Sequence, residues 1–201
     1  MTLTQIEKYR YKKYHKDYLK IFKKEKDILD NIKNIKIEHI ADQLNSSVAF
    51  SCSANSPPTK NNRKTKLEDY IGSTAVKGLG GKGVIDIMIG VKKDNMRNVS
   101  REIQKKGAIL IHKEKNRWFF EKDSNYKFVK RIHIQLVSFN CVMWKNTILF
   151  RDYLIKNRKA RSEYSKIKKT ASKLANGDGV LYRKHKNSFI NKILKINGEI
   201  K

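Results

Sequence analysis

The sequence has few cysteines and no long apolar run, and each absence excludes a class of protein. The two cysteines, Cys52 and Cys141, lack the close spacing of a metal site. We expect no disulfide between them, which fits the reducing cytoplasm. No stretch approaches the roughly 20 apolar residues that a membrane-spanning helix needs, and the first twenty residues contain no apolar core of a signal peptide. The expected location is therefore the cytoplasm, with no membrane as a partner.

Acidic residues are also scarce. The chain has 19 Asp and Glu residues against 46 Lys and Arg residues, which gives a formal net charge of +27. A field of this sign attracts polyanions, so nucleic acid is the expected partner. A genomic bias toward lysine is the alternative explanation, although such a bias ordinarily brings glutamate with it. With 201 residues, 39% of them apolar, the chain is expected to bury one core as a single domain.

One stretch concentrates the glycines. Residues 71–91 hold six of the ten, and the first, Gly72, precedes two hydroxyl residues, Ser73 and Thr74. A glycine turn lets backbone N–H groups approach a phosphate closely. The stretch ends in an apolar run with a single acid, Asp86, which is costly there unless it is paired or binds a cation. The residues between the Gly-Ser turn and Asp86 leave room for one short helix. The pattern therefore predicts a phosphate-binding turn beside a metal ligand. The alternative is an ordinary strand-loop-helix-strand unit in which the aspartate has a hydrogen-bond or ion-pair partner within the protein.

The same stretch does not match two common phosphate-binding motifs. Residues 78–83 fit Gly-x-Gly-x-x-Gly by letter, but they precede a predicted strand instead of following one. No Gly-Lys-Ser/Thr occurs at the spacing of a P-loop. We therefore expect neither a dinucleotide-binding fold nor a kinase of the P-loop type.

Hydrophobic periodicity predicts an α+β fold, a mixed β-sheet packed by helices, with a helical C-terminal part at 142–197. Helical spacing occurs at 14–33 and 98–106, and alternation predicts strands at 35–40, 84–91, 108–112, 117–121 and 130–137. The C-terminal helical patterns lie at 142–156, 159–174 and 185–196. Residues 1–13 are predicted to form a basic arm.

Several motifs together resemble the GrpB family. The core of that family reads Glu-His-Ile-Gly-Ser-Thr-Ser-Val, then Gly-Leu and an Ile-Ile-Asp-Ile strand. This chain has Ile-Gly-Ser-Thr-Ala-Val at 71–76, Gly-Leu at 78–79 and Val-Ile-Asp-Ile at 84–87. Further on, it has Arg-Trp-Phe-Phe at 117–120, Arg-Ile-His-Ile at 131–134 and Leu-Phe-Arg-Asp-Tyr-Leu at 149–154, which are similar to later segments of the family. The resemblance extends over most of residues 14–195.

An insertion interrupts the resemblance at residues 41–70. Ser, Asn, Pro and Lys dominate its part at 45–66, which predicts a flexible loop or a disordered segment. Its end, Leu-Glu-Asp-Tyr-Ile at 67–71, reads as a second copy of Ile-Glu-His-Ile at 37–40. Chain connectivity favours the second copy as the strand before the Gly-Ser turn, whereas the family pattern favours the first.

The resemblance implies a nucleotidyltransferase-like fold of the polymerase β type, with Mg²⁺ (or Mn²⁺) held between acids on adjacent strands and a nucleoside triphosphate. The usual second acid of the strand is replaced by Met88, a poor ligand for Mg²⁺. Asp86 is the first expected metal ligand and catalytic residue, and Glu38, or alternatively Asp69, is expected to supply the second. His133 is the third catalytic candidate, as a ligand, a phosphate contact or a base. The alternatives are a solvated strand face for Glu38 and a half-exposed structural histidine.

Five residues are expected to bind the nucleotide: Gly72, Ser73, Thr74, Lys82 and Arg151. A guanidinium binds phosphate through two parallel hydrogen bonds, which favours Arg151 as a contact of the triphosphate. Lys82 flanks the turn. Ser73 and Thr74 have an alternative role as helix caps without a ligand.

The predicted C-terminal helices are strongly basic, which suits contact with an RNA backbone. The expected contacts are Lys166, Lys169, Lys173, Arg183 and Lys184. The resemblance to the GrpB family implies Mg-dependent transfer of a nucleoside monophosphate from an NTP, and the family together with the positive charge implies an RNA 3′ end, with RNA ahead of DNA and tRNA as the expected acceptor. The alternatives are transfer to a hydroxyl of a protein or small molecule, and a nucleotide- or RNA-binding module without catalysis.

Overall fold

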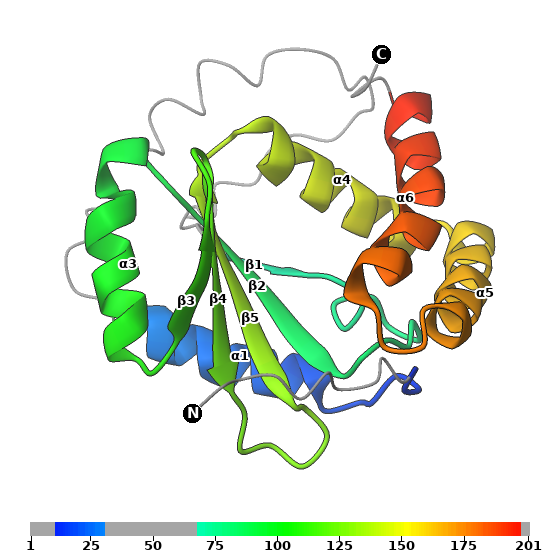
Figure 1. Cartoon of the computed structure of the whole chain (residues 1–201), viewed down its shortest axis with the longest axis horizontal. Helices are drawn as coiled ribbons and strands as arrows, with labels where there is room; N and C mark the ends of the chain where they lie inside the picture. Colours follow the sequence, from blue (N-terminus) through cyan, green and yellow to red (C-terminus); the bar gives the residue numbers. More distant parts are fainter. Residues whose placement is uncertain (1–10, 31–67, 198–201) are drawn as a thin grey trace, which may run out of the picture.

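The computed structural model describes residues 11–30 and 68–197 (Figure 1). The predicted strand at 35–40, with Glu38, lies outside these residues. So do residues 1–10 of the predicted basic arm and nearly all of the insertion at 41–70. The described residues form one five-stranded sheet and five α-helices with a short 3-10 helix, η2 (Lys93–Asn95).

The sheet has the strand order β1-β2-β5-β4-β3. The strands are β1 (Glu68–Ile71), β2 (Val84–Val91), β3 (Ile109–Lys113), β4 (Arg117–Asp123) and β5 (Arg131–Ser138). The two central strands, β2 and β5, pair in parallel, and the other pairs are antiparallel. The predicted mixed sheet and the strand predictions within residues 84–137 are therefore confirmed, with shifts of one or two residues at the strand ends.

One face of the sheet is apolar and packs on two helices, α1 (Tyr18–Asp30) and α3 (Met96–Lys105). Alternation along the central strands places Ile85, Ile87 and Ile89 on this face, because successive side chains of a strand point to opposite sides. Figure 1 shows α1 crossing behind the strands. The predicted first helix begins at Tyr18 and not at residue 14.

The opposite face carries the C-terminal helices α4 (Val142–Lys156), α5 (Arg158–Leu174) and α6 (Gly179–Ile196). Helix α4 packs on the sheet through Trp144, which joins a cluster with Met88 and Val137. Helix α6 begins six residues earlier than the predicted 185. The side chain of Asp178 accepts hydrogen bonds from the backbone of Val180 and Leu181, which caps the helix at that point.

The segment between β1 and β2 contains turns, and the short helix expected there is wrong. Backbone hydrogen bonds from Val76 to Ser73 and from Leu79 to Val76 make consecutive turns, and two positive-φ glycines, Gly72 and Gly78, interrupt any helical repeat. Lys12 forms an antiparallel bridge with Gly81 on the far side of this segment. Lys12 is therefore bonded to the glycine-rich segment, and residues 11–13 are not helical.

The α+β fold class with a helical C-terminal part is confirmed. No helix of residues 11–30 and 68–197 is long and apolar enough to cross a membrane.

Candidate functional site

Asp86 lies in the middle of β2, on the sheet face that the C-terminal helices cover. Its Cα is opposite Ile71 of β1 on one side and His133 of β5 on the other. The Asp86 side chain is 22% exposed, and the backbone of Gly72 packs against its carboxylate. A Cβ atom at Gly72 would overlap that carboxylate, and its φ of +72° is unfavourable for any other residue. Glycine therefore allows the Gly-Ser turn to rest directly on the acid, as the sequence predicts.

His133 connects Asp86 to a second carboxylate. Its Nδ1 lies 3.3 Å from Oδ1 of Asp86, and its Nε2 lies 3.4 Å from Oε1 of Glu121 on β4. Nη1 of Arg131 donates a hydrogen bond of 2.9 Å to the other oxygen of Glu121. Residues from three adjacent strands thus form a row of alternating charge across the sheet.

The charge row fixes the protonation of His133. Burial alone lowers the pKa of the imidazole, but hydrogen bonds with Asp86 and Glu121 outweigh burial and raise that pKa to about 9. The hydrogen bond with His133 in turn lowers the pKa of the Glu121 carboxyl. At neutral pH an imidazolium therefore lies between two carboxylates. In that state it has no lone pair for a metal ion or for proton abstraction, so its available roles are hydrogen-bond donor and cation.

Met88 occupies the position where the nucleotidyltransferase pattern has a second acid. Its side chain is fully buried in the cluster with Ile71, Val137 and Trp144, so this part of the strand contributes to the core. The backbone of Asp69 lies opposite Met88 on β1. Among the side chains that the structure describes, which do not include that of Asp69, no group of three or more His, Cys, Asp and Glu residues could hold a metal ion. These side chains alone therefore do not form a site for two metal ions.

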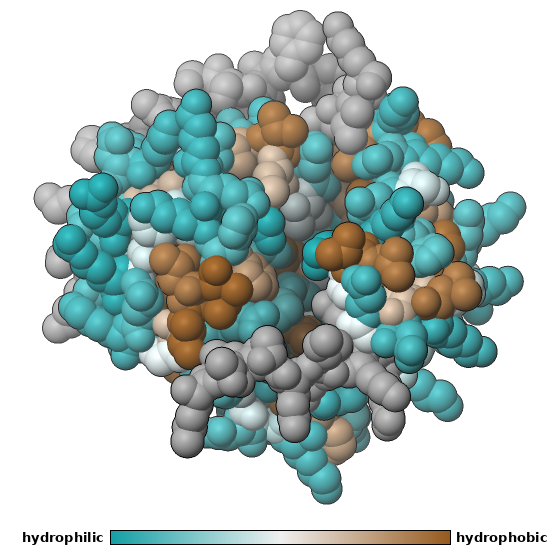
Figure 2. All heavy atoms as spheres, in the orientation of Figure 1, coloured by the Kyte–Doolittle hydropathy of each residue, from teal (hydrophilic) through white to brown (hydrophobic). Residues whose placement is uncertain are grey.

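A cavity of about 490 Å³ opens above the charge row, between the sheet and the helices α4, α5 and α6. Figure 2 shows the corresponding hollow near the centre of this face of the molecule. Seven residues expected at the site line this cavity: Gly72, Ser73, Lys82, Asp86, His133, Arg151 and Arg183. The fold therefore brings the predicted turn, the acid, the histidine and three of the predicted cations to one place.

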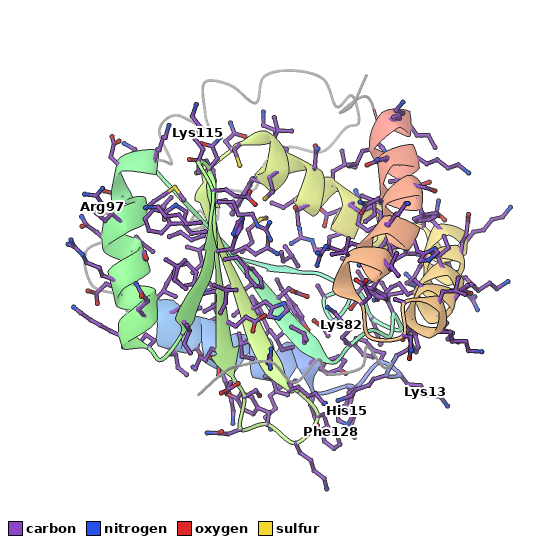
Figure 3. The ribbon with its side chains drawn as sticks, in the orientation of Figure 1. Lys13, His15, Lys82, Arg97, Lys115 and Phe128 are labelled. Atoms are coloured by element: carbon purple, nitrogen blue, oxygen red, sulfur yellow. The ribbon has the colours of Figure 1, made fainter. Side chains whose placement is uncertain are left out.

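Cations gather at the end of the cavity beside α5 and α6. Lys186 and Lys82 both lie over the ring of Tyr182, with Nζ 4.3 Å and 5.6 Å from its centroid. Burial and then the charge of Lys82 lower the pKa of Lys186 to about 8. Arg183 adds to this effect. Figure 3 labels Lys82 at this end of β2, below α6. Like charges held this close favour an anion between them.

Lys168 is the buried member of this cationic group. It is 3% exposed, and its Nζ donates a hydrogen bond of 2.6 Å to the carbonyl of Gly80. Burial, followed by the charge of Lys186, lowers its pKa well below the usual value. A Cβ atom at Gly81 would overlap the hydroxyl of Ser73 and lie within 2.9 Å of this Nζ. Lys168 therefore contacts the glycine-rich segment between β1 and β2 at the wall of the cavity.

Two of the predicted nucleotide ligands have structural contacts. Thr74 is almost fully buried, does not line the cavity, and donates a hydrogen bond to the carbonyl of Val84, which ties the turn to β2. Arg151 lines the cavity, but it also bonds Asp152 at 2.7 Å and the carbonyl of Tyr70 at 3.1 Å. Arg151 thus joins α4 to β1 at the cavity wall.

The predicted RNA contacts fall into two groups. Arg183 lines the cavity. Lys166, Lys169, Lys173 and Lys184 are exposed on α5 and α6 outside it. Seven further residues, which were not predicted as site residues, also line the cavity: Arg117, Phe119, Glu121, Gln135, Asn146, Lys168 and Lys186. The sequence does contain a pattern that indicates burial of Lys168. Helical spacing places it on the same face of α5 as four buried residues, Ala160, Tyr164, Ala171 and Ala175.

The family model described as GrpB protein matches residues 58–196, which is more than half of the chain. The chain belongs to the GrpB family. The glutamate-rich protein GrpB of Alkalihalophilus pseudofirmus is 30% identical over 128 residues, which cover 61% of this chain and 74% of that relative. The GrpB match includes Asp69, Gly72 and Asp86, whereas Glu38 precedes it.

A solved structure has the same fold. The crystal structure of conserved protein GrpB from Enterococcus faecalis is similar with a TM-score of 0.61 and 20% identity, covering 93% of this chain and 96% of that one. At this identity the likeness concerns the fold alone. It supports the five-stranded mixed sheet with a helical C-terminal part as the GrpB architecture.

Proposed function

We propose that the cavity binds a nucleoside triphosphate and that the protein is a nucleotidyltransferase. The observation that carries this proposal is the contact of the Gly72 turn with Asp86, in the same cavity as a cluster of cations. A cavity of about 490 Å³ is within the usual range of small-molecule sites. Lys82, Arg183 and Lys186 are the residues that we assign to the terminal phosphates.

We assign one Mg²⁺ ion to the side chains that the structure describes. Asp86 offers carboxylate oxygen, and Mg²⁺ is commonly bound by one or two carboxylates together with phosphate oxygens and water. A bound ion would neutralise phosphate charge at the reacting phosphorus. Met88 lies in an apolar cluster, and Glu121 is bonded to His133 and Arg131, so neither is available as a second ligand.

The reaction that we propose is an attack of an acceptor hydroxyl on the α-phosphorus of the NTP. The new O–P bond forms as the bond to the bridging oxygen breaks, and pyrophosphate leaves. Asp86 is the group that we assign to orient and deprotonate the hydroxyl, because His133 retains its own proton at neutral pH. Both N–H groups of the imidazolium face carboxylates, so His133 orients the Asp86 side chain and offsets its charge, and the lysines stabilise the leaving pyrophosphate.

An RNA 3′ end is the acceptor that we propose, with tRNA as the first candidate. The net charge of +27 and the exposed lysines of α5 and α6 favour a polyanion beside the cavity. A second function is favoured by a separate observation. Because Met88 is part of the core and His133 is a cation, the same cavity also suits a nucleotide-binding module without catalysis.

Incubation of the purified protein with Mg²⁺, each labelled NTP and bulk tRNA separates these functions. We expect label on RNA, and we expect Asp86→Asn to abolish its transfer. Asp94→Asn is the matched control, because Asp94 is an exposed acid of η2 outside the cavity. Label on protein or on a small molecule would identify another acceptor. NTP binding without any transfer would support the binding module, and full activity of Asp86→Asn would overturn the site assignment.

A further inference from the structure

The end of the cavity away from the lysines has a different chemical character. Its lining includes Arg117 and Phe119 of β4, Gln135 of β5 and Asn146 of α4. Phe119 and Gln135 are direct partners across the β4–β5 ladder. Instead of a cluster of lysines, this end offers one aromatic ring, two carboxamides and one guanidinium.

Two polar atoms at this end are buried and lack a hydrogen-bond partner among the residues that the structure describes. They are Nε of Arg117, a donor, and Oδ1 of Asn146, an acceptor. Buried polar groups in folded proteins almost always have a partner, so an exception needs an explanation. Both residues line the cavity, and a bound ligand that carries an acceptor and a donor would satisfy the two atoms together.

The ring of Phe119 supplies an apolar surface beside these atoms. It is partly exposed, and it contacts the imidazole of His133 in an edge arrangement with centroids 5.0 Å apart. The guanidinium carbon of Arg117 lies 5.5 Å from the ring centroid. An aromatic ring next to an arginine is a common surface for stacking of a nucleobase.

The order of groups along the strands fits the length of a nucleotide. Gln135 is two residues along β5 from His133, and Arg117 is opposite Val137, four residues along. At about 3.3 Å per residue these positions are roughly 7 and 13 Å beyond Asp86, so their side chains can meet a base whose α-phosphate lies near Asp86. The lysine cluster lies in the other direction, and Figure 3 labels Lys82 and Lys115, which precedes β4, at opposite ends of the sheet.

We propose that Arg117, Phe119, Gln135 and Asn146 form the nucleobase subsite of this cavity. The inference rests on the proposed binding of an NTP and adds where its base lies. Phe119 stacks the base, Nε of Arg117 donates to an acceptor on its edge, and the amide of Asn146 bonds the neighbouring polar group. Because an amide can turn by 180°, Asn146 fits either a donor or an acceptor of the base.

Binding measurements with two ligands test this subsite separately from the phosphate end. The affinities of each NTP and of inorganic tripolyphosphate are measured for the wild type, Asn146→Ala and Phe119→Leu. We expect each variant to lose about tenfold or more in affinity for the preferred NTP, with unchanged affinity for tripolyphosphate. Lys145→Ala, an exposed neighbour on α4, is the matched control and should bind both ligands like the wild type.

The outcomes distinguish this inference from the proposed function. If the wild type binds NTP and the two subsite variants bind it equally well, the subsite is wrong and the NTP site stands. If these variants lose affinity for RNA instead of NTP, the subsite belongs to the acceptor and our assignment is overturned. If the wild type binds neither NTP nor tripolyphosphate, the proposed function fails and this inference with it. Unchanged thermal unfolding midpoints establish that a loss of affinity is not a loss of fold.

Discussion

Nδ1 of His133 lies 3.3 Å from Oδ1 of Asp86, and the two residues are direct partners on the parallel strands β2 and β5. The register of the two central strands therefore creates the pair. Glu121 approaches the other ring nitrogen from the antiparallel strand β4, where it is the direct partner of His133. Three strands thus hold a cation between two carboxylates at the floor of the cavity, and the properties of that cation can be measured.

Stability should depend on the proton of His133. The pKa of the folded state is about 9, above the usual 6.5 of an unfolded histidine. The stabilising contribution is therefore complete below pH 6.5 and is lost as the pH rises through 9. We expect the free energy of unfolding of the wild type relative to His133→Gln to fall by about 3 kcal/mol over that window, as measured by denaturant unfolding.

The comparison with His133→Gln is necessary because Lys186 titrates in the opposite sense. Its folded pKa of about 8 is below the usual value of a lysine, so deprotonation above pH 8 removes a destabilising charge. The titration of Lys186 affects the wild type and His133→Gln equally, so it cancels in the difference between their free energies of unfolding. A flat difference between pH 6 and 9.5 would show that the imidazole is not held as a cation.

Gly72 should tolerate no side chain. Its φ of +72° disfavours alanine, and a Cβ atom there would overlap the carboxylate of Asp86. Gly78 is a matched control, because its φ is +84° and no atom lies within 4 Å of its added Cβ. We expect Gly72→Ala to lower the free energy of unfolding by about 1–3 kcal/mol more than Gly78→Ala. Equal losses would mean that the turn does not pack on Asp86.

Much of the sheet could be predicted from the sequence because alternation is a local signal. The pattern of β2 placed Asp86 among residues that face away from Ile85 and Ile87, and the pattern of β5 did the same for His133. Both now line the cavity. Glu121 has the same kind of alternation, but nothing local indicates which residue lies opposite it on a neighbouring strand.

The errors have a common physical origin in contacts between distant segments. The turns at 72–83 are held by Lys12 and by Lys168, which are far away in the sequence, so a short helix was expected where none forms. Lys168 belongs to the same basic helix as the lysines that were predicted to contact RNA, but it is buried. Its position opposite the carbonyl of Gly80 depends on how α5 packs against the glycine-rich segment, which sequence periodicity does not give.

Binding of an anion should be accompanied by uptake of a proton at Lys186. A phosphate beside Lys82 and Lys186 offsets their mutual repulsion and raises the pKa of Lys186 above its free value of about 8. At pH 8 about half of the free lysine is deprotonated, so we expect roughly half a proton to be taken up at this residue. Calorimetric titration with tripolyphosphate in buffers of different ionisation enthalpy measures this number.

The same titration contains its own controls. At pH 6.5 Lys186 is already protonated, so its contribution to proton uptake should vanish. Lys186→Met should remove that contribution at pH 8 and lower the affinity, whereas Lys20→Met, an exposed position of α1 on the other side of the sheet, should change neither. If Lys186→Met binds with the proton uptake of the wild type, the anion does not lie at this end of the cavity.

RNA should bind the helical side of the molecule and not the side covered by α1. Four exposed lysines of α5 and α6, Lys166, Lys169, Lys173 and Lys184, are changed together to alanine. Each phosphate contact of a single strand contributes about 0.7 to the slope of log K against log salt, so the loss of four contacts should reduce this slope by about 3. The affinities of labelled tRNA at several salt concentrations give the slope.

A variant of equal charge separates this specific surface from the general field of the molecule. Lys16, Lys20, Lys23 and Lys24 lie in or just before α1, are exposed, and their change to alanine removes the same four charges. A protein of net charge +27 attracts RNA from every side, so the control should slow association slightly. Counterions are released only where lysines contact the RNA backbone directly. The control should therefore retain the wild-type slope of log K against log salt. Equal reductions of the slope in both variants would show that RNA is bound by net charge alone, without a surface beside the cavity.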